Sequence, residues 1–386
     1  MREWLDSRRA VSPSLPSVPR RRRRPLLMWA VLPGLVVMLV AVGAKQSLGS
    51  TPAQRVIGGL SASRVSVVAA HQFRRYSTPT GGTLLGAISY GMGGKFWFTE
   101  VNSGKIGSIS LDGRIHEYTI PWPDSVPEDV VRGPDGRMWF TEQGIGSIGA
   151  IAKNGLVTNY LVPPSDGAPI GLALGPDNRL WFTLQYANKI GAMSASGKVS
   201  EYQIPVPNAA PHDIARGPDG RLWFTEPGAG RVGAITTTGV ITEYALPAPD
   251  SGVRDIVAGP DGRLWFSEFT TDKIGAITTA GKVTEYNVPT PDAGPHGLTT
   301  AYGLVWFAEQ NSGAVGAVSP TGLFSTVDIG ARSQPAFVAP GPAGTIWLTE
   351  DGPPSIGVLS RTLTAQLSAQ FGGRDGKTGL PRAVGA

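Results

Sequence analysis

The chain has 386 residues, of which 41% are apolar, so it can bury a sizeable core. Its formal net charge is +5, but residues 1–25 hold eight Arg against two acidic residues, a local balance of +6 that leaves about −1 for the remainder. This distribution argues against a basic nucleic-acid-binding surface, and we expect no nucleic-acid partner. The absence of Cys excludes disulfides, a thiol nucleophile and Cys-ligated metals.

The first 70 residues carry a membrane-targeting pattern. The run Arg20–Arg24 precedes an uncharged apolar stretch at residues 26–44, which is long enough to cross the hydrocarbon core as a helix. We therefore expect a basic cytoplasmic tail at 1–25, a transmembrane anchor at 26–44, a linker at 45–70 and an extracytoplasmic domain beyond it. The small residues Val42-Gly43-Ala44 leave open a cleaved signal segment and a secreted protein.

Seven tryptophans mark an internal repeat with spacings of 42, 42, 42, 42, 41 and 41 residues. They are Trp97, Trp139, Trp181, Trp223, Trp265, Trp306 and Trp347. A period of this length, with several short strand patterns in each unit, is typical of propeller blades. The sequence therefore predicts an all-β fold, a seven-bladed β-propeller over residues 71–360 that follows the N-terminal transmembrane or signal helix. We expect it to be a monomer.

The fourth repeat illustrates the expected blade. His212–Arg216 should form the inner strand and Arg221–Glu226 the second strand, joined by the turn Gly217-Pro218-Asp219-Gly220. Arg231–Thr237 and Val240–Leu246 should form the third and outer strands. Apolar and polar residues alternate in these segments, and Gly and Pro supply the backbone angles of the turns.

One segment upstream of the first Trp repeat predicts how the ring closes. Arg74–Pro79 matches the outer-strand pattern of Thr284–Pro289 but has no other strands before it. We expect it to be the outer strand of the seventh blade, whose inner strands come from Pro335–Leu359, so that no open sheet edge remains. The last segment, residues 361–386, is polar and is interpreted as a dispensable tail.

The second strand ends in Glu in six of the seven repeats. Because neighbouring strands are antiparallel, this end should lie on the same face as the start of the inner strand, around the central channel. The recurrence favours a scaffolding role, with each Glu bonded to a backbone amide or to a neighbouring Lys or Arg, such as Lys105 or Lys273. A carboxylate ring that holds a cation is the alternative. The residues are Glu100, Glu142, Glu226, Glu268, Glu309 and Glu350.

Positions that differ between repeats are better candidates for function. Eleven residues before each Trp, or ten in the sixth repeat, the chain has Gly86, Glu128, Ile170, His212, Arg254, His296 and Ala336. A His at this register suits a general base or a metal ligand, and a His bonded to a loop carbonyl is the structural alternative. Arg254 and Glu128 could bind charged substrate groups or pair with neighbours. The remaining histidines, His71 and His116, should lie at the outer surface.

Two aromatic residues belong to loops expected on the same face. Trp122 and Tyr186 could line an apolar substrate pocket, or could simply pack against the loops around them.

The repeated motifs resemble those of the streptogramin B lyases, also called virginiamycin B lyases. They are Gly-Pro-Asp-Gly-Arg-Leu-Trp-Phe-Thr-Glu, Lys-Ile-Gly-Ala-Ile-Thr and Thr-Glu-Tyr-x-x-Pro, and the likeness covers residues 72–360. The resemblance implies a seven-bladed propeller that linearises a cyclic depsipeptide antibiotic by Mg²⁺-dependent elimination at the ester. It also implies a His that acts on the proton α to a carbonyl while the metal stabilises developing negative charge.

The site motifs of the family can be matched in two ways. Pro295-His296-Gly297-Leu298 and the following Trp306-Phe307-Ala308-Glu309 resemble the final blade of the family, which implies His296 as base and Glu309 as metal ligand. Arg254 then stands where the family has a second His. If the blades are matched in order from the start, Pro335-Ala336 takes the second His place and Glu350 becomes the ligand.

The resemblance implies a lyase-like enzyme outside the cytoplasm that opens a cyclic ester, with His296 and His212 as candidate catalytic residues and Mg²⁺ held by Glu309 or by Glu350. The alternative is a membrane-tethered module that binds a small molecule or peptide on the channel face without chemistry. A lactonase-like metal hydrolase would rest on the Glu ring alone.

Overall fold

The computed structural model describes residues 65–67, 72–163 and 167–375. The predicted anchor at 26–44, the basic tail and His71 lie outside these ranges. Within them, no helix has the length and apolar character needed to span a membrane.

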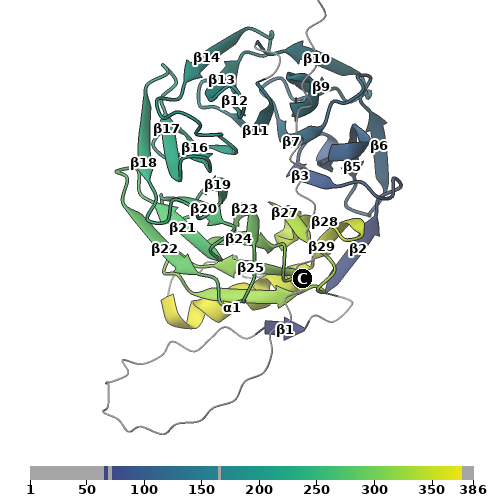
Figure 1. The fold of residues 1–386 in the computed structure, drawn as a ribbon. Helices are drawn as coiled ribbons and strands as arrows, with labels where there is room; N and C mark the ends of the chain where they lie inside the picture. Colours follow the sequence, from purple (N-terminus) through teal and green to yellow (C-terminus); the bar gives the residue numbers. More distant parts are fainter. Residues whose placement is uncertain (1–64, 68–71, 164–166, 376–386) are drawn as a thin grey trace, which may run out of the picture. The chain divides into compact units, whose positions relative to one another are not determined.

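The predicted seven-bladed propeller is confirmed, because seven sheets of four antiparallel strands surround a central channel (Figure 1). The first three blades contain β3 (Leu85–Tyr90), β4 (Phe96–Glu100), β5 (Lys105–Ile109), β6 (Ile115–Thr119), β7 (Pro127–Arg132), β8 (Met138–Glu142), β9 (Ser147–Ile151), β10 (Val157–Leu161), β11 (Pro169–Leu174), β12 (Leu180–Leu184), β13 (Lys189–Met193) and β14 (Val199–Gln203). The next two contain β15 (Ile214–Arg216), β16 (Leu222–Glu226), β17 (Arg231–Ile235), β18 (Ile241–Ala245), β19 (Val253–Ala258), β20 (Leu264–Glu268), β21 (Lys273–Ile277) and β22 (Val283–Asn287). The sixth blade has β23 (Pro295–Ala301), β24 (Leu304–Glu309), β25 (Ala314–Val318) and β26 (Phe324–Asp328), with β1 (Val65–Val67) added in parallel to β26.

The ring closes as the sequence predicts. The seventh blade combines β27 (Pro335–Pro340), β28 (Ile346–Asp351) and β29 (Pro354–Leu359) with β2 (Phe73–Ser77), which pairs antiparallel with β29. The side chain of Arg75 in β2 forms an ion pair of 2.9 Å with the buried Glu350 of β28. Both the backbone ladder and this ion pair therefore hold the two ends of the propeller together.

The second strand of each blade makes the core between neighbouring blades. Successive side chains of a strand point to opposite faces, so the Trp and the Phe of one strand contact different neighbours. Trp181 of β12 packs in one cluster with Phe224 of β16, and Trp347 of β28 packs with Phe98 of β4 across the closure. The repeat of 41 or 42 residues is thus a repeat of one interface.

The turn before the second strand is fixed by its own side chains. In the fourth blade, the Asp219 carboxylate accepts a hydrogen bond of 3.2 Å from Trp223 Nε1 and pairs with Arg221 at 2.7 Å. The Arg221 guanidinium lies 4.6 Å from the centre of the Trp223 ring. The third strand needs a Gly where the Phe ring of the second strand packs against its backbone, since a Cβ at Gly233 would lie 2.2 Å from the Phe224 ring.

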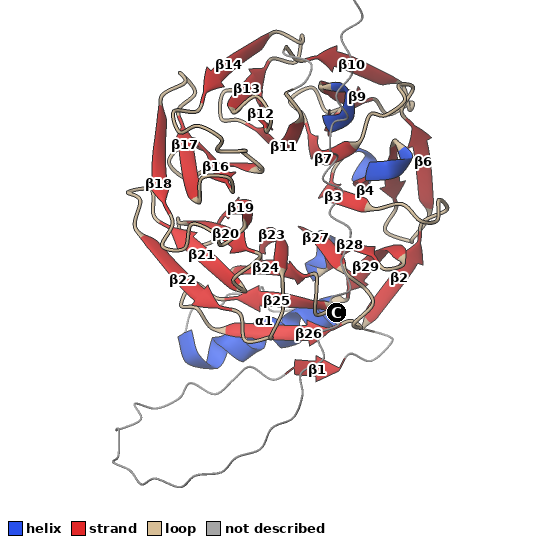
Figure 2. Ribbon diagram, viewed as in Figure 1, coloured by secondary structure: helices blue, strands red, loops and turns tan. Residues whose placement is uncertain are grey.

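The C-terminal segment corrects one expectation. Residues interpreted as a polar, dispensable tail form the helix α1 (Arg361–Asp375), which lies beside the sixth blade in Figure 2. Leu363, Leu367 and Phe371, spaced four residues apart, are buried in the cluster that includes Trp306 and Leu348. One face of α1 therefore completes the core between the sixth and seventh blades.

The recurring Glu residues at the end of the second strand are all buried and are not exposed on the channel. Ser103 donates to Glu100 at 3.0 Å, and Asn159 donates to Glu142. The expected partners Lys105 and Lys273 do not bond these residues, because they pair with Glu117 and Glu285 of the outer strands at 2.7 and 2.5 Å. The scaffolding role is supported, with hydroxyl and amide partners for Glu100 and Glu142 and an Arg partner, Arg75, for Glu350.

In two of these residues, Glu226 and Glu268, neither carboxyl oxygen finds a hydrogen-bond donor within the described residues. Burial, followed by the charge of Glu243, raises the pKa of Glu226 to about 8. A carboxyl with a raised pKa stabilises the fold below its unfolded pKa near 4.5, and this stability is lost as the pH rises through 8.

We therefore expect the free energy of unfolding of the wild type to fall between pH 5 and pH 9. Glu226→Gln should reduce this fall by about 2 kcal/mol, because the amide has no proton to lose. Urea unfolding at both pH values measures the difference. The exposed Asp112→Asn serves as control and should leave the fall unchanged. Equal falls in wild type and Glu226→Gln would contradict this explanation.

Candidate functional site

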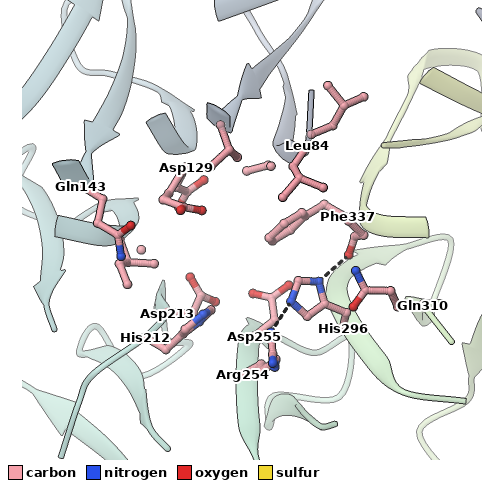
Figure 3. Close-up of a pocket in the computed structure, with 18 of the residues that line it drawn as sticks. Leu84, Asp129, Gln143, His212, Asp213, Arg254, Asp255, His296, Gln310 and Phe337 are labelled. Atoms are coloured by element: carbon pink, nitrogen blue, oxygen red, sulfur yellow. Dashed lines mark hydrogen bonds between the residues drawn. The ribbon is translucent and has the colours of Figure 1, made fainter. Parts of the chain in front are cut away.

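A cavity of about 350 Å³ opens at the channel where the inner strands begin. All seven blades contribute to its wall, and the residues brought together include the predicted Glu128, His212, Arg254 and His296. Figure 3 shows Gln143 and Asp129 across the cavity from His296 and Phe337. All seven residues of the predicted register line this cavity, one from each blade.

A bulge at the start of the inner strand directs these side chains into the cavity. In β19, Val253 pairs with Glu268 and the ladder resumes only at Ile256, so Arg254 and Asp255 lie in the irregular segment. Such bulges re-aim side chains beside functional sites. In the fourth blade the inner strand is shorter than predicted, and β15 begins at Ile214 rather than at His212.

In the fourth blade a Thr of the second strand holds the start of the inner strand from behind. The Thr225 hydroxyl accepts a hydrogen bond of 3.0 Å from the amide of Asp213 in its own blade. The same hydroxyl donates to the carbonyl of Arg254 in the next blade at 2.6 Å. One buried hydroxyl thus sets the backbone positions of two cavity residues.

His296 is buried, with 8% of its surface exposed, and both ring nitrogens have partners. Arg254 Nη1 lies 3.1 Å from Nε2, and since Arg only donates, Nε2 is the acceptor. Nδ1 therefore carries the proton and donates to the carbonyl of Ala336 at 3.0 Å. Burial, followed by the charge of Arg254, lowers the pKa of His296 to about 3. The imidazole is neutral with a defined tautomer.

Arg254 is a half-buried cation without a carboxylate partner. Its guanidinium lies 4.4 Å from the centre of the Phe269 ring, and the bond to His296 is its one side-chain hydrogen bond among the described residues. Burial lowers the pKa of Arg254, but an Arg remains charged at neutral pH. The remaining guanidinium N–H groups are available to a ligand.

His212 lies on the same wall and is held through its backbone. Its carbonyl accepts from Gly171 N at 3.0 Å and from the Thr183 hydroxyl at 2.9 Å. Within the described residues its buried Nδ1 finds no partner. Burial and the charge of Arg254 lower the pKa of His212 to about 4, so it too is neutral.

Four aspartates of the cavity connect neighbouring blades. Asp129 accepts from Leu172 N at 2.7 Å, and Asp213 accepts from Ile256 N at 2.8 Å. Asp255 accepts from Leu298 N, and Asp351 accepts from Leu85 N at 2.8 Å. Burial raises the pKa of Asp129 to about 7, and burial, followed by the charge of Asp255, raises the pKa of Asp213 well above its usual range. These four carboxyl groups therefore bind the backbone of the neighbouring blade and stabilise the ring.

The two predicted metal ligands lie elsewhere. Glu309 is buried inside its blade and accepts hydrogen bonds of 3.0 Å from Ser312 and Thr326. Glu350 is bound by Arg75 and Ser355. Neither lines the cavity, and the described residues contain no cluster of three His or acidic side chains suited to a metal. The donor set of the predicted Mg²⁺ site therefore does not fit this group.

The two aromatic candidates also lie outside the cavity wall. Trp122 is 36% exposed and Tyr186 is 74% exposed, and neither lines the cavity. Apolar wall residues come instead from Leu84, Leu85 and Phe337. His116 is exposed on the outer strand β6, as expected.

Polar residues at the end of the second strand also line the cavity, and they were not predicted from the sequence. Gln143, Gln185 and Gln310 stand directly after the end of the strand, Asp351 is the last residue of β28, and all four line the cavity. The signal was present, since the residue four positions after the Trp differs between repeats while the preceding Glu recurs.

Comparison with known proteins places the chain in a protein family. A model described as the virginiamycin B lyase family matches residues 60–252 and 173–367. The structure is similar to virginiamycin B lyase from Staphylococcus aureus, with 36% identity over 74% of this chain and 98% of that chain and a TM-score of 0.71. A catalytically inactive His-to-Ala variant of that enzyme with quinupristin is similar at 35% identity, 74% and 98% coverage, and TM-score 0.71. A streptogramin B lyase gives 32% identity, 75% and 97% coverage, and TM-score 0.71. No curated protein matches the sequence.

Proposed function

Because the chain belongs to the virginiamycin B lyase family, we propose that it is a carbon–oxygen lyase that opens a cyclic ester, such as a type B streptogramin, by elimination. The observation that carries this proposal is the contact of 3.1 Å between His296 and Arg254 on the cavity wall. A neutral imidazole is a base, and an unpaired guanidinium beside it can stabilise negative charge on oxygen.

The elimination balances with these two groups. The proton on the carbon α to a carbonyl moves to Nε2 of His296, and a double bond forms between the α and β carbons. The bond from the β carbon to the ester oxygen breaks, and the electron pair leaves on a carboxylate next to Arg254. No water is consumed, so the linear product has the mass of the cyclic substrate.

Arg254 must turn before His296 can accept a proton, since its Nη1–H occupies the lone pair of Nε2. An ester oxygen of the substrate can take over this hydrogen bond. Negative charge developing there would offset the guanidinium and raise the pKa of His296 from its low value in the free cavity. Substrate binding would then both free the base and strengthen it.

The family resemblance implies Mg²⁺, but Glu309 and Glu350 are engaged inside their blades. We therefore assign no step to a metal, and the assay includes an arm with Mg²⁺ and an arm with a chelator.

A second candidate function is ligand binding without chemistry. It is favoured by the occupied lone pair of Nε2 and by the side-chain amides of Gln143, Gln185 and Gln310 around the cavity, which suit the peptide groups of a ligand.

One experiment on the full chain distinguishes the two candidate functions. Quinupristin is incubated with the protein, with Mg²⁺ or with EDTA, and loss of the cyclic compound is followed by chromatography, while calorimetry measures binding. The proposal expects catalytic loss of the cyclic compound in at least one arm. Binding without turnover in both arms would overturn the lyase and favour the second candidate.

A further inference from the structure

The charged groups of the cavity fall into two classes. Asp129, Asp213, Asp255 and Asp351 each accept a backbone N–H from the next blade, so the scaffold uses them. Glu128 and Arg254 have no such bond and no ion-pair partner among the described residues. Charges withdrawn from water without a partner are costly, which makes these two the groups available for a ligand.

Glu128 is held by its backbone while its carboxylate stays free. The Thr99 hydroxyl of the first blade donates to the Glu128 carbonyl at 2.8 Å. Its carboxylate makes no hydrogen bond within the described residues, and burial, followed by the charge of Asp129, raises the pKa of Glu128 to about 7. A cationic group of a ligand would restore the lost solvation of this carboxylate.

The two free charges lie on opposite walls. Glu128 belongs to β7 of the second blade and Arg254 to β19 of the fifth, which are separated by two blades in one direction and three in the other. Figure 3 shows Asp129, the neighbour of Glu128, across the cavity from Arg254. Gln143 and Gln185 on one side and Leu84 and Phe337 on the other complete the wall.

We propose that this cavity selects a bipolar, peptide-like ligand, with a cationic group at Glu128 and a carboxyl group at Arg254. The inference rests on the proposed function and deepens it. In the lyase substrate, the group bound at Arg254 would be the ester, and elimination would convert it into the leaving carboxylate. Amides along the intervening wall would bind the peptide groups, and the cavity of about 350 Å³ suits a ligand portion of two or three residues.

The test uses the tripeptide Gly-Phe-Gly in four forms, with its amino end free or acetylated and its carboxyl end free or amidated. Calorimetry at pH 7.5 on the full chain gives the four dissociation constants. We expect the doubly free form to bind most tightly, and blocking either end to weaken binding about tenfold, because each block removes one charge-assisted contact. Millimolar affinity for the doubly free form is sufficient for the comparison.

Two variants assign each charge to its partner. Glu128→Gln should abolish the preference for a free amino end and keep the preference for a free carboxyl end, while Arg254→Gln should do the reverse. The exposed Arg114→Gln is the matched control and should behave as wild type. Equal binding of the four forms, no binding of any form, or preferences unchanged in both variants would overturn the proposal.

This experiment does not depend on turnover, because the peptides contain no ester. A charge preference in a protein that leaves quinupristin intact would contradict the proposed lyase function but support the proposal of a bipolar ligand. Turnover of quinupristin without any charge preference would contradict only the proposal of a bipolar ligand.

Discussion

Replacing His296 with Gln is expected to lower kcat/KM for a cyclic ester substrate about 100- to 10,000-fold, the range typical of losing a general base. A Gln side chain can still donate to the Ala336 carbonyl and accept from Arg254, the two contacts of 3.0 and 3.1 Å that His296 makes. The substitution therefore removes the base and keeps the cavity. Steady-state kinetics with quinupristin provides the measurement.

His212→Gln is the matched control, since His212 occupies the same register and is also neutral, but does not contact Arg254 through a hydrogen bond. We expect a smaller loss of kcat/KM, confined to substrate binding and seen in KM. A His296→Gln protein that keeps turnover within tenfold of wild type would show that another group removes the proton.

Removing the Phe371 side chain is expected to lower the free energy of unfolding by about 3 to 5 kcal/mol, as for other large aromatic groups truncated in a core. Phe371 is 1% exposed and packs with Leu367 in the cluster of the sixth and seventh blades. Urea unfolding of Phe371→Ala measures the loss. Thr362→Ala on the exposed face of α1 is the control and should change stability little. A loss below about 1 kcal/mol for Phe371→Ala would mean that α1 is dispensable after all.

The blades could be predicted because each repeats one interface. A Trp of one blade packs against the Phe of the next blade, as Trp181 does with Phe224. The regular sequence spacing of the Trp residues therefore reflects the regular recurrence of this contact. The closure followed from the strand pattern at Arg74–Pro79, since an unpaired outer strand needs a sheet to join.

The helix α1 could not be predicted with the same rules. Its buried stripe consists of Leu363, Leu367 and Phe371, with Thr364 and Ser368 buried beside it. Small polar side chains on the buried face blur the apolar periodicity by which an amphipathic helix is recognised. The core between the sixth and seventh blades, not the local sequence, defines this helix.

The site was predicted in part, and the error at the Glu positions has a geometric cause. Alternate residues of a strand share a face, so Glu226 lies on the same face as Phe224 and reaches back over Gly233, where a Cβ would lie 2.5 Å from its Oε1. The carboxylate at the end of the strand therefore points into the blade. The following residue, such as Gln143 or Gln310, is the one that faces the channel.

The chemistry assigned to the His296 and Arg254 pair is tested most directly by the mass of the product formed in ¹⁸O-labelled water. Elimination forms a linear compound with the mass of cyclic quinupristin and without label, because no bond to water is made. A product heavier by one labelled water molecule would show hydrolysis and would contradict elimination.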